Sequence, residues 1–296
     1  MAMRLALAPI PFFWPADAVA DFYAMIASTS VDIVYLGETV CYKRRGPTLA
    51  EWLAIADRLA DHGKEVVLSS LVLVDGEAEL KATRRLCANG RYLVEANDMS
   101  AVSLCRGSRF VAGATLNVYN EDALAILAEA GAERFVASVE LSGAALATLR
   151  AGGPAGLDCE VLAFGRPALA YSARCFSARN ADRGKDHCEW ICEQEPEGVL
   201  VRTQEDDAFL TLNGLQIHAA HPINVLGEID AMREAGVDIL RIMPEIRDTA
   251  LVIDAFRGVL DGRYPLGEAQ ARLSPLTGGL NANGYWRGLA GRSHAP

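Results

Sequence analysis

The sequence predicts an α/β protein of the (β/α)8 TIM-barrel type, with a cysteine-bearing insertion after the seventh strand. Strand-like and helix-like segments alternate from the first residues, the strand count reaches eight, and the spacing is regular apart from one gap. Most of the strand-like runs are short, continuous and apolar, which is typical of strands covered on both faces. The 296 residues, 51% of them hydrophobic, can bury a large core. An open doubly wound sheet is the alternative architecture.

Eight segments are predicted as strands. The first seven follow one another closely, and the eighth comes much later. They are Arg4–Pro9, Val31–Leu36, Glu65–Ser70, Arg91–Glu95, Phe110–Ala114, Arg134–Ser138, Asp158–Ala163 and Val237–Ile242. The cluster Gly152–Gly156 precedes a strand, so it is read as a turn rather than as a dinucleotide-binding loop.

Helices are predicted between these strands from their capping residues and their glycine stops. The predicted segments are Pro47–His62 with Pro47 at the first helical position, Glu121–Ala130 capped by Asn120, Gly143–Ala151 capped by Ser142, Asn224–Ala235 ending at Gly236, and Thr249–Leu260 capped by Asp248.

The gap in the repeat is an insertion of roughly residues 164–223, between the seventh strand and its helix. Its second half reads as a small antiparallel unit. The strands expected there are Val199–Thr203, Ala208–Leu212 and Leu215–Ala219, with turns at 205–207 and at Asn213-Gly214. The tail from about 262 to 296 is rich in Gly, Asn and Pro and is expected to be irregular. The whole chain, 1–296, is expected to form one barrel domain.

Four cysteines stand in polar, loop-like segments, where packing gives no reason for a thiol. Cys175, Cys188 and Cys192 form a C-x12-C-x3-C run inside the insertion, and Cys41 follows the second strand. In a barrel, the loops after strands two and seven open on the same face, so the four thiols are expected to converge. Cys188 and Cys192 are one helical turn apart, which would point both sulfurs the same way. Four such thiols predict an iron–sulfur or zinc site.

Zinc is the competing interpretation of this cysteine pattern. Structural zinc sites show paired C-x2–4-C knuckles, whereas only one close pair exists here, so the spacing favours an iron–sulfur cluster. His187, next to Cys188, could replace a cysteine as a metal ligand, but it is interpreted as a solvated side chain in a charged loop. Cys87, Cys105 and Cys159 lie in predicted helices and a strand and are expected to pack in the core.

Several polar residues follow strands and could line the same face, although capping or loop hydrogen bonding is the simpler reading of each. His218 and His221 are expected to end the predicted hairpin rather than to line a site. The strand-following residues are Glu38, Ser69, Ser70, Asn97, Asp98, Asn117, Tyr119, Glu140 and Arg241.

Composition excludes some classes of function. The net charge of −10 argues against a nucleic-acid partner held through phosphate contacts. No run of about 18 uninterrupted apolar residues is present, so no integral membrane segment is expected. The start of the chain shows no secretory signal, which predicts the cytoplasm, where seven cysteines would stay reduced instead of forming a disulfide framework.

The cysteine pattern and its surroundings resemble the collagenase-like peptidase family, class thirty-two of unknown type. Nearly the whole chain takes part in the resemblance. The residues that carry it are Cys41 with the C-x12-C-x3-C run, the string Ala170–Cys175, the opening Leu7–Ile10, the stretch Tyr35–Cys41 and the closing Asn283–Trp286. The broader family has a further cysteine and a glycine where this chain has Ala168 and Ala173. This departure weakens a proteolytic reading and fits the branch of oxygen-independent ubiquinone biosynthesis.

That resemblance implies a 4Fe–4S cluster held by Cys41, Cys175, Cys188 and Cys192, and a heterodimer with a UbiU-type sister protein that carries its own cluster. It implies hydroxylation of the aromatic ring of ubiquinone precursors without molecular oxygen, with prephenate as oxygen donor, small-molecule substrates and an associated lipid-carrier protein. Four cysteine ligands leave no open iron corner, so an electron-transfer or structural role is expected for the cluster. Catalytic residues are unassigned. A peptidase-like hydrolase and a non-enzymatic scaffold for the partner are the alternatives.

Overall fold

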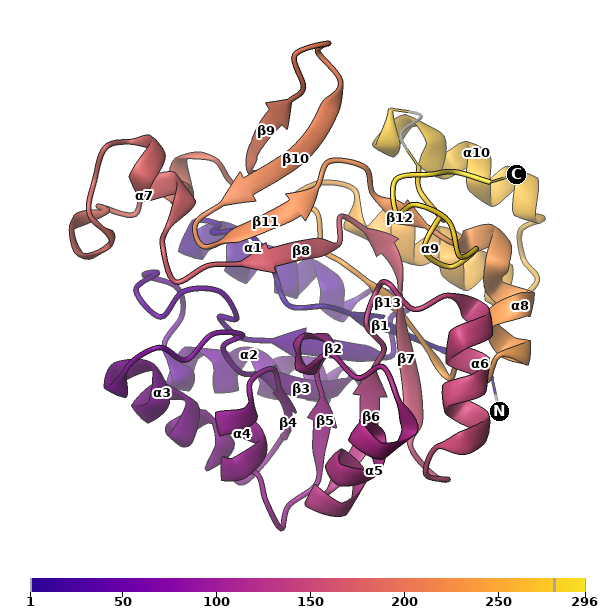
Figure 1. Ribbon diagram of the computed structural model, residues 1–296, viewed down its shortest axis with the longest axis horizontal. Coiled ribbons are helices and arrows are strands. Elements are labelled where there is room, and N and C mark those ends of the chain that lie inside the picture. The colour runs from indigo at the N-terminus through magenta and orange to yellow at the C-terminus, as the bar shows by residue number, and fades with distance from the viewer. Residues whose placement is uncertain (1, 279–280, 296) are drawn as a thin grey trace.

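Eight parallel strands close into a barrel in the computed structural model, which describes residues 2–278 and 281–295. Neighbouring strands pair in the order β1-β2-β3-β4-β5-β6-β7-β13, and β13 pairs with β1 to complete the ring. The predicted (β/α)8 fold is therefore confirmed (Figure 1). The barrel strands are β1 (Arg4–Leu7), β2 (Ile33–Leu36), β3 (Glu65–Ser69), β4 (Leu93–Ala96), β5 (Phe110–Ala112), β6 (Ala132–Val136), β7 (Asp158–Gly165) and β13 (Ile239–Ile242).

Alternation along each strand divides the core into two layers. Side chains such as Ile33, Tyr35 and Val67 point into the barrel and form an inner apolar cluster. Their neighbours Val34 and Leu36 point outward and pack beneath the helices in the larger cluster. Both layers exclude water, which is why the strands read as continuous apolar runs in the sequence.

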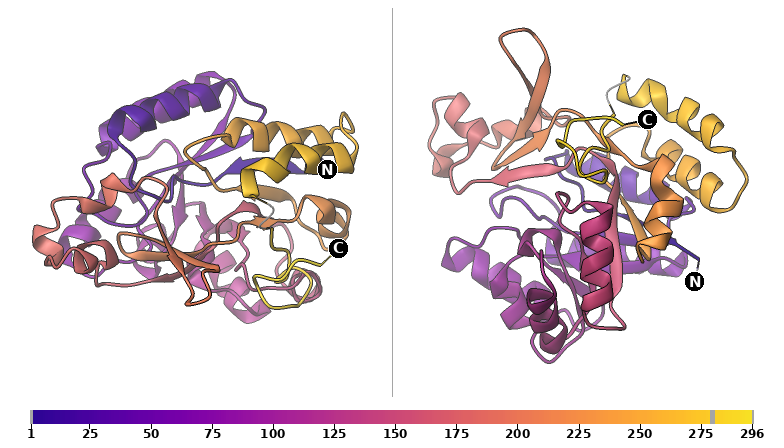
Figure 2. Two further views of the ribbon diagram at one scale, coloured as in Figure 1. Left: turned by 90° about the horizontal axis from the view of Figure 1, so that it is seen from above. Right: turned by 45° about the vertical axis from the view of Figure 1, so that its right-hand side comes forward.

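Helices cover the outside of the barrel between successive strands (Figures 1 and 2). They are α1 (Ala16–Ala27), α2 (Leu49–Asp61), α3 (Glu77–Cys87), α4 (Met99–Leu104), α5 (Glu121–Ala130), α6 (Gly143–Gly152), α8 (Ile229–Glu234), α9 (Thr249–Leu260) and α10 (Leu266–Thr277), with short 3-10 turns η1 (Ala114–Leu116) and η4 (Leu226–Glu228).

The predicted caps hold for two helices and need correction for others. The side chains of Asn120 and Ser142 cap α5 and α6 as expected. Helix α2 begins two residues later than predicted, at Leu49, because Thr48 is the N-cap and forms a capping box with Glu51, which leaves Pro47 outside the helix. Asp248 precedes α9 in a left-handed conformation and makes no side-chain capping bond.

Two predicted segments differ more strongly from the observed structure. The helix expected over Asn224–Ala235 is shorter, since β12 (Ile223–Asn224) pairs with β7 and a 3-10 turn intervenes before α8. The prediction of an irregular tail is wrong for its first part, where α10 packs against α9 despite Pro275 inside the helix. Glycine and proline counts do not reveal an amphipathic helix that buries Ala269 and Leu273.

Between β7 and β13 the chain forms a second, four-stranded antiparallel sheet in the order β8-β11-β10-β9. The Asn213-Gly214 turn joins β10 to β11, as the sequence predicts. The strand β8 was not predicted. The bounds are β8 (Ala168–Tyr171), β9 (Val199–Arg202), β10 (Ala208–Asn213) and β11 (Gln216–Ala219). Between β8 and β9 lie α7 (Phe176–Asn180), η2 (Lys185–His187) and η3 (Ile191–Gln194). Figures 1 and 2 place α7 and α10 on opposite sides of the molecule.

No helix within residues 2–278 and 281–295 combines the length and the apolar character needed to cross a bilayer.

Candidate functional site: a thiol cavity beside the barrel mouth

The four loop cysteines line one small cavity, which we call the thiol cavity. Cys41 comes from the loop after β2, and the other three come from the segment between β8 and β9. The described residues that line this cavity are Cys41, Lys43, Arg44, Cys175, Lys185, Cys188, Trp190, Ile191, Cys192 and Gly214. The structure thus brings together the four cysteines that the sequence analysis selected, across a separation of more than 130 positions in the chain.

The loop that carries Cys41 is shaped by one carboxylate. Oε1 of Glu38 accepts hydrogen bonds from the backbone N–H groups of Val40 at 2.7 Å and Cys41 at 2.9 Å. The same oxygen lies 3.3 Å from Nη1 of buried Arg44. Glu38 therefore holds the chain in a tight turn that turns Cys41 and Arg44 toward the same cavity.

Cys175 occupies the N-cap position of α7, and its sulfur accepts a hydrogen bond from the Ala178 backbone N–H at 3.4 Å. Hydrogen bonds of this kind lower the energy of a thiolate and, in a cluster ligand, raise the reduction potential. The helix is fixed in turn by the Gly214 N–H, which donates to Ser177 Oγ at 2.8 Å.

Cys188 and Cys192 do not lie on one helical turn, so that prediction is wrong. Glu189 and Trp190 between them adopt left-handed backbone conformations, with φ of 48° and 52°. The reversal allows the Trp190 indole N–H to donate to the Lys43 carbonyl at 2.5 Å, while Arg45 stacks on the indole ring at 3.5 Å. The two cysteine-bearing loops are therefore joined through Trp190 rather than through helix geometry.

Asn213, at the end of β10, ties three segments together from a fully buried position. Its amide oxygen accepts from Arg44 Nη2 at 2.7 Å and from the Phe13 N–H at 3.2 Å. Its amide nitrogen donates to the carbonyls of Cys192 and Glu195, each at 2.9 Å. The next residue must be glycine, because its φ is +69° and an added Cβ would lie 3.1 Å from Arg44.

We expect Asn213→Ala to lower the free energy of unfolding by about 2 kcal/mol, because buried donors and acceptors lose their partners. The Cys192 thiol should also become more reactive toward a thiol reagent in the metal-free protein. Urea unfolding and timed thiol labelling measure the two effects. The control is Asn120→Ala, which removes an exposed cap on α5 and should leave thiol labelling unchanged. Equal labelling rates in all three proteins would show that Asn213 does not hold the cysteine loop.

The charges around the thiol cavity suit a negatively charged occupant. Three cations, Lys43, Arg44 and Lys185, line it, and no carboxylate is among the described lining residues. Their acidic partners Asp186, Glu38 and Asp75 are not among the lining residues. Nε of Arg44 is buried without a hydrogen-bond partner in the described part of the chain. Four thiolates together with a metal group would find compensating charge and a spare donor here.

Burial raises the pKa of two of the four thiols that line the cavity. It raises the pKa of Cys192 to about 11, against the opposing effect of the neighbouring Arg44 guanidinium. Burial also raises the pKa of Cys41, and the nearby Cys175 adds to that shift. Both thiols are therefore protonated at neutral pH.

The four sulfurs surround the cavity and do not converge on a single point. Within residues 2–278 and 281–295, no group of three or more His, Cys, Asp or Glu side chains is arranged to hold one metal ion. His187 is exposed in η2 and does not line the thiol cavity.

The remaining cysteines lie elsewhere. Cys105 and Cys159 are buried, and Cys87 is half-buried against the same core. A hydrogen bond between the thiols of Cys87 and Cys105 raises the pKa of Cys87 and lowers that of Cys105. Burial raises the pKa of Cys159 to about 12. These thiols pack in the interior as predicted, away from the thiol cavity.

A second, larger cavity of about 380 Å³ opens at the carboxyl ends of the barrel strands. We call it the mouth cavity. All eight barrel strands or the loops that follow them contribute to its wall, and β8 and β11 of the second sheet roof it. Of the strand-following residues singled out in the sequence, Asn97, Asn117, Glu140 and Arg241 line it, whereas Glu38 shapes the Cys41 loop.

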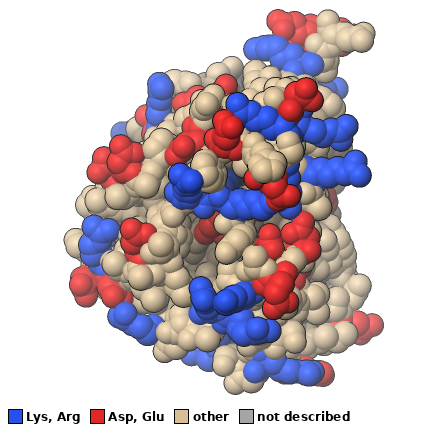
Figure 3. Space-filling view, turned by 90° about the vertical axis from the view of Figure 1, so that its left-hand side faces the viewer, with Lys and Arg blue, Asp and Glu red and all other residues tan. Residues whose placement is uncertain are grey.

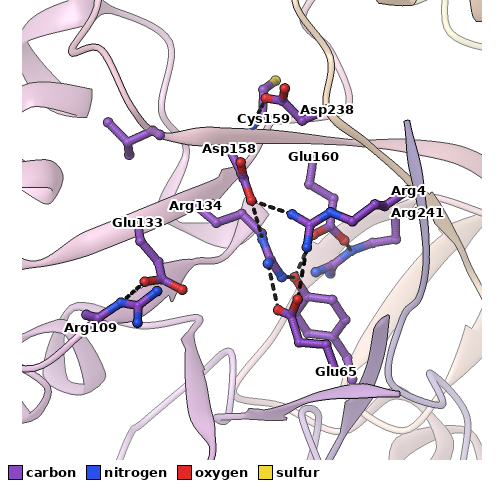
Figure 4. A network of polar contacts seen from close by, with 12 residues as sticks. Arg4, Glu65, Arg109, Glu133, Arg134, Asp158, Cys159, Glu160, Asp238 and Arg241 are labelled. Atoms are coloured by element: carbon purple, nitrogen blue, oxygen red, sulfur yellow. Dashed lines mark hydrogen bonds and ion pairs between the residues drawn. The ribbon is translucent and has the colours of Figure 1, made fainter. Parts of the chain in front are cut away.

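Beneath the mouth cavity, charged side chains cross the barrel interior in a connected network (Figure 4). Arg241 Nε donates to Glu160 Oε1 at 2.5 Å, and Glu160 Oε2 accepts from the Tyr35 hydroxyl at 2.5 Å. Tyr35 accepts in turn from Arg134 at 3.1 Å, and Arg134 pairs with Glu65 at 2.7 Å. The network reaches from the cavity floor to the opposite end of the barrel.

His218 lines the mouth cavity, contrary to the expectation that it only ends a hairpin. It is 1% exposed in β11, and its Nδ1 lies 2.8 Å from the Arg166 carbonyl. Burial lowers its pKa to about 4, so the ring carries no charge at neutral pH.

Sequence reasoning missed Glu95, Ser138, Glu160 and Gln216. Glu95 and Glu160 lie within predicted strands, and period-2 alternation places them on the interior face. A charged residue inside an otherwise apolar, doubly covered strand was the available signal for this site.

A family model described as Peptidase family U32 matches residues 19–275. Among solved structures, the chain is similar to the U32 peptidase Mk0906, with 13% identity, 83% of this chain and 94% of that chain covered, and a TM-score of 0.48. It is also similar to N-acetylneuraminate lyase from Aliivibrio salmonicida, with 10% identity, 93% and 80% covered, and a TM-score of 0.40. The spore cortex-lytic enzyme SleL from Bacillus cereus shows 9% identity, 83% and 72% covered, and a TM-score of 0.40.

Proposed function

This chain belongs to peptidase family U32, and we propose that it is an iron–sulfur subunit, of the UbiV type, of an oxygen-independent hydroxylase acting on the aromatic ring of ubiquinone precursors. The observation that carries the proposal is the thiol cavity, where Cys41 meets Cys175, Cys188 and Cys192. Membership of the family alone does not distinguish a peptidase from a hydroxylase subunit. The four cysteines, and the family resemblance of the residues around them, support a hydroxylase subunit.

Four thiols around one cavity, with no group arranged to hold a single metal ion in the described residues, support a 4Fe–4S cluster over zinc. A zinc ion needs four sulfurs within about 4 Å of one another, whereas a cubane takes one sulfur at each of four separated corners. The thiol cavity has a volume of about 20 Å³, so its walls must move outward to seat a cluster. The side chains of Lys43 and Lys185 are 33% and 26% exposed and can swing toward solvent.

The chain's own residues would hold and tune the group. The four cysteines would bind as thiolates, the Ala178 N–H would donate to the Cys175 sulfur, and Arg44 would place a cation beside Cys192. Such a cluster, when bound, supplies one-electron transfer. Asn213 and Trp190 keep the two loops together, so that both halves of the ligand set face one space.

Two of the cavity thiols, Cys41 and Cys192, lack the lowered pKa of a nucleophilic cysteine. A nucleophilic cysteine has a lowered pKa, but burial raises the pKa of Cys192 and of Cys41. The surface does not suggest a nucleic-acid substrate either. Figure 3 shows Lys and Arg interspersed with Asp and Glu over the face it presents.

We further propose that this subunit works as a heterodimer with a UbiU-type sister protein, in the cytoplasm, with prephenate as oxygen donor and in association with a lipid-carrier protein. The family resemblance supports these partners.

An anaerobic assay with the purified sister protein tests the proposal. Hydroxylation of a ubiquinone precursor in the presence of prephenate should require this chain, and Cys192→Ser should abolish it. The matched control, Cys105→Ser, changes a thiol outside the cavity and should retain activity. If Cys192→Ser supports full activity at equal partner solubility, the chain is a scaffold, and the electron-transfer role is rejected.

A further inference from the structure

The mouth cavity has the dimensions of a binding site for a small molecule. Its volume of about 380 Å³ lies within the range of roughly 300–1,000 Å³ that such sites occupy. It opens where the carboxyl ends of the barrel strands meet, under a roof that includes Tyr171 and Gln216 from the second sheet. No residue of the thiol cavity lines it, so within the described residues the two cavities are separate.

Three buried polar atoms in this cavity have no hydrogen-bond partner in the described part of the chain. They are Oε1 of Glu95, Oγ of Ser138 and Nη2 of Arg241, on residues that are 1%, 4% and 8% exposed. Buried polar groups are nearly always hydrogen-bonded, so these three atoms have hydrogen-bonding capacity that a molecule in the cavity could use. The Tyr119 hydroxyl, which donates to Glu140 at 3.2 Å, lies beside Ser138.

Glu95 and Arg241 present complementary groups to that occupant. Oε2 of Glu95 already accepts from Ser69 Oγ at 2.6 Å, whereas Oε1 lies 2.7 Å from Arg241 Nη2 without the alignment of a hydrogen bond. The carboxylate oxygen can thus accept from a ligand, and the guanidinium can donate to it. A ligand that carries a donor next to an acceptor satisfies both.

The charge balance excludes a strongly anionic ligand. Arg241 is the only cation among the described residues that line the mouth cavity, and it already contacts two carboxylates, those of Glu95 and Glu160. A third negative charge would face Glu95 and Glu140 without a free cation. The remaining wall is largely apolar, with Val72, Leu162 and Met243 among its side chains.

The two cavities share one wall. The Pro11 carbonyl accepts from Arg44, which lines the thiol cavity, and from the Gln216 side chain, which lines the mouth cavity. A ligand in the mouth cavity would therefore lie one layer of residues from a group held by the thiols.

We propose that the mouth cavity binds a small uncharged organic molecule with an apolar frame and an adjacent hydrogen-bond donor and acceptor, held by Glu95, Ser138 and Arg241. The location beside the thiol cavity makes this the substrate site of the proposed function, and to that extent the inference rests on it. The binding itself requires neither iron nor a partner.

Three probes of one shape test the proposal on the anaerobically purified protein. Benzamide carries a donor and an acceptor, benzoate carries acceptors and a negative charge, and benzamidinium carries donors and a positive charge. In NMR titrations, benzamide should bind about tenfold more tightly than either of the others, because only it satisfies both charged groups. Absence of saturable binding, or tighter binding of benzoate or benzamidinium, would overturn the proposal.

Two serine variants give a matched comparison. Oγ atoms of Ser138 and Ser100 are both buried without a partner, but only Ser138 lines the cavity. Ser138→Ala should weaken benzamide binding about fivefold, as expected for one lost hydrogen bond, while Ser100→Ala should leave it unchanged. Equal effects of the two variants on benzamide binding would show that Ser138 does not contact the ligand.

Glu95→Gln should remove the preference for benzamide over benzoate, an effect that a purely structural role would not produce. Loss of one carboxylate leaves Arg241 less neutralised, so benzoate should gain about tenfold relative to benzamide. An unchanged ratio in a folded Glu95→Gln protein would contradict the role of this pair.

A colourless protein that binds benzamide would reject the iron–sulfur function alone, whereas an iron-loaded protein that binds none of the probes would reject only this inference.

Discussion

Replacing Cys41 with serine is expected to remove most of the iron and sulfide that the protein carries after anaerobic purification. Cys41 is the one described lining thiol that comes from the barrel side of the thiol cavity, and the other three belong to the insertion. Without it, a cluster would be held by the insertion alone. Loss of an outer-shell partner already weakens metal binding by about 10- to 100-fold, and loss of a direct ligand should exceed that range.

Iron and acid-labile sulfide per chain, together with the visible spectrum, measure this effect. The matched control is Cys87→Ser, which changes a half-buried thiol that pairs with Cys105 and does not line the cavity. The control should keep its full iron content. Unchanged iron in Cys41→Ser would remove Cys41 from the ligand set and would leave the convergence of the two loops without a function.

Replacing Glu160 with alanine is expected to lower the free energy of unfolding by about 3–5 kcal/mol, the range for breaking a buried ion pair from one side. Glu160 is fully buried and accepts from both Arg241 and Tyr35. Its removal leaves Arg241 with Glu95 as its remaining described carboxylate partner and leaves the Tyr35 hydroxyl without an acceptor. Urea unfolding of the purified variant gives the measurement.

Glu133→Ala is the control for Glu160→Ala, since Glu133 lies on β6, the strand that pairs with the β7 strand of Glu160; both residues are labelled in Figure 4. Glu133 pairs with Arg109, whose side chain is 78% exposed, so its loss should cost at most about 1 kcal/mol. Equal effects of the two substitutions would mean that the interior network contributes no more than a surface pair.

The barrel could be predicted because its signals are local. Strands such as Ile33–Leu36 are short apolar runs covered on both faces. Asn120 and Ser142 are N-cap residues, and each marks the start of the helix that follows it in the sequence. The cysteine set could be chosen because thiols in polar loops lack a packing role. Their convergence followed from barrel topology, which places loops after strands on one face.

The mouth cavity and the loop geometry could not be predicted in the same way. The left-handed turn at Glu189 and Trp190 depends on a tertiary contact with Lys43, and no local pattern encodes it. The strand β8 is only four residues long and half exposed, so it lacks the apolar run that revealed the barrel strands. The partners of Glu95 and Arg241 lie on strands far apart in the sequence, and only the closed barrel joins them.

The central claim is that thiolates from two distant loops hold one iron–sulfur cluster in the thiol cavity. The most direct test is iron and acid-labile sulfide analysis of the wild-type protein, purified without exposure to air, together with its visible absorption spectrum. We expect a brown protein with iron and sulfide in the equal amounts of one 4Fe–4S cluster per chain. A colourless protein without iron, with all four cavity thiols free to react, would contradict it.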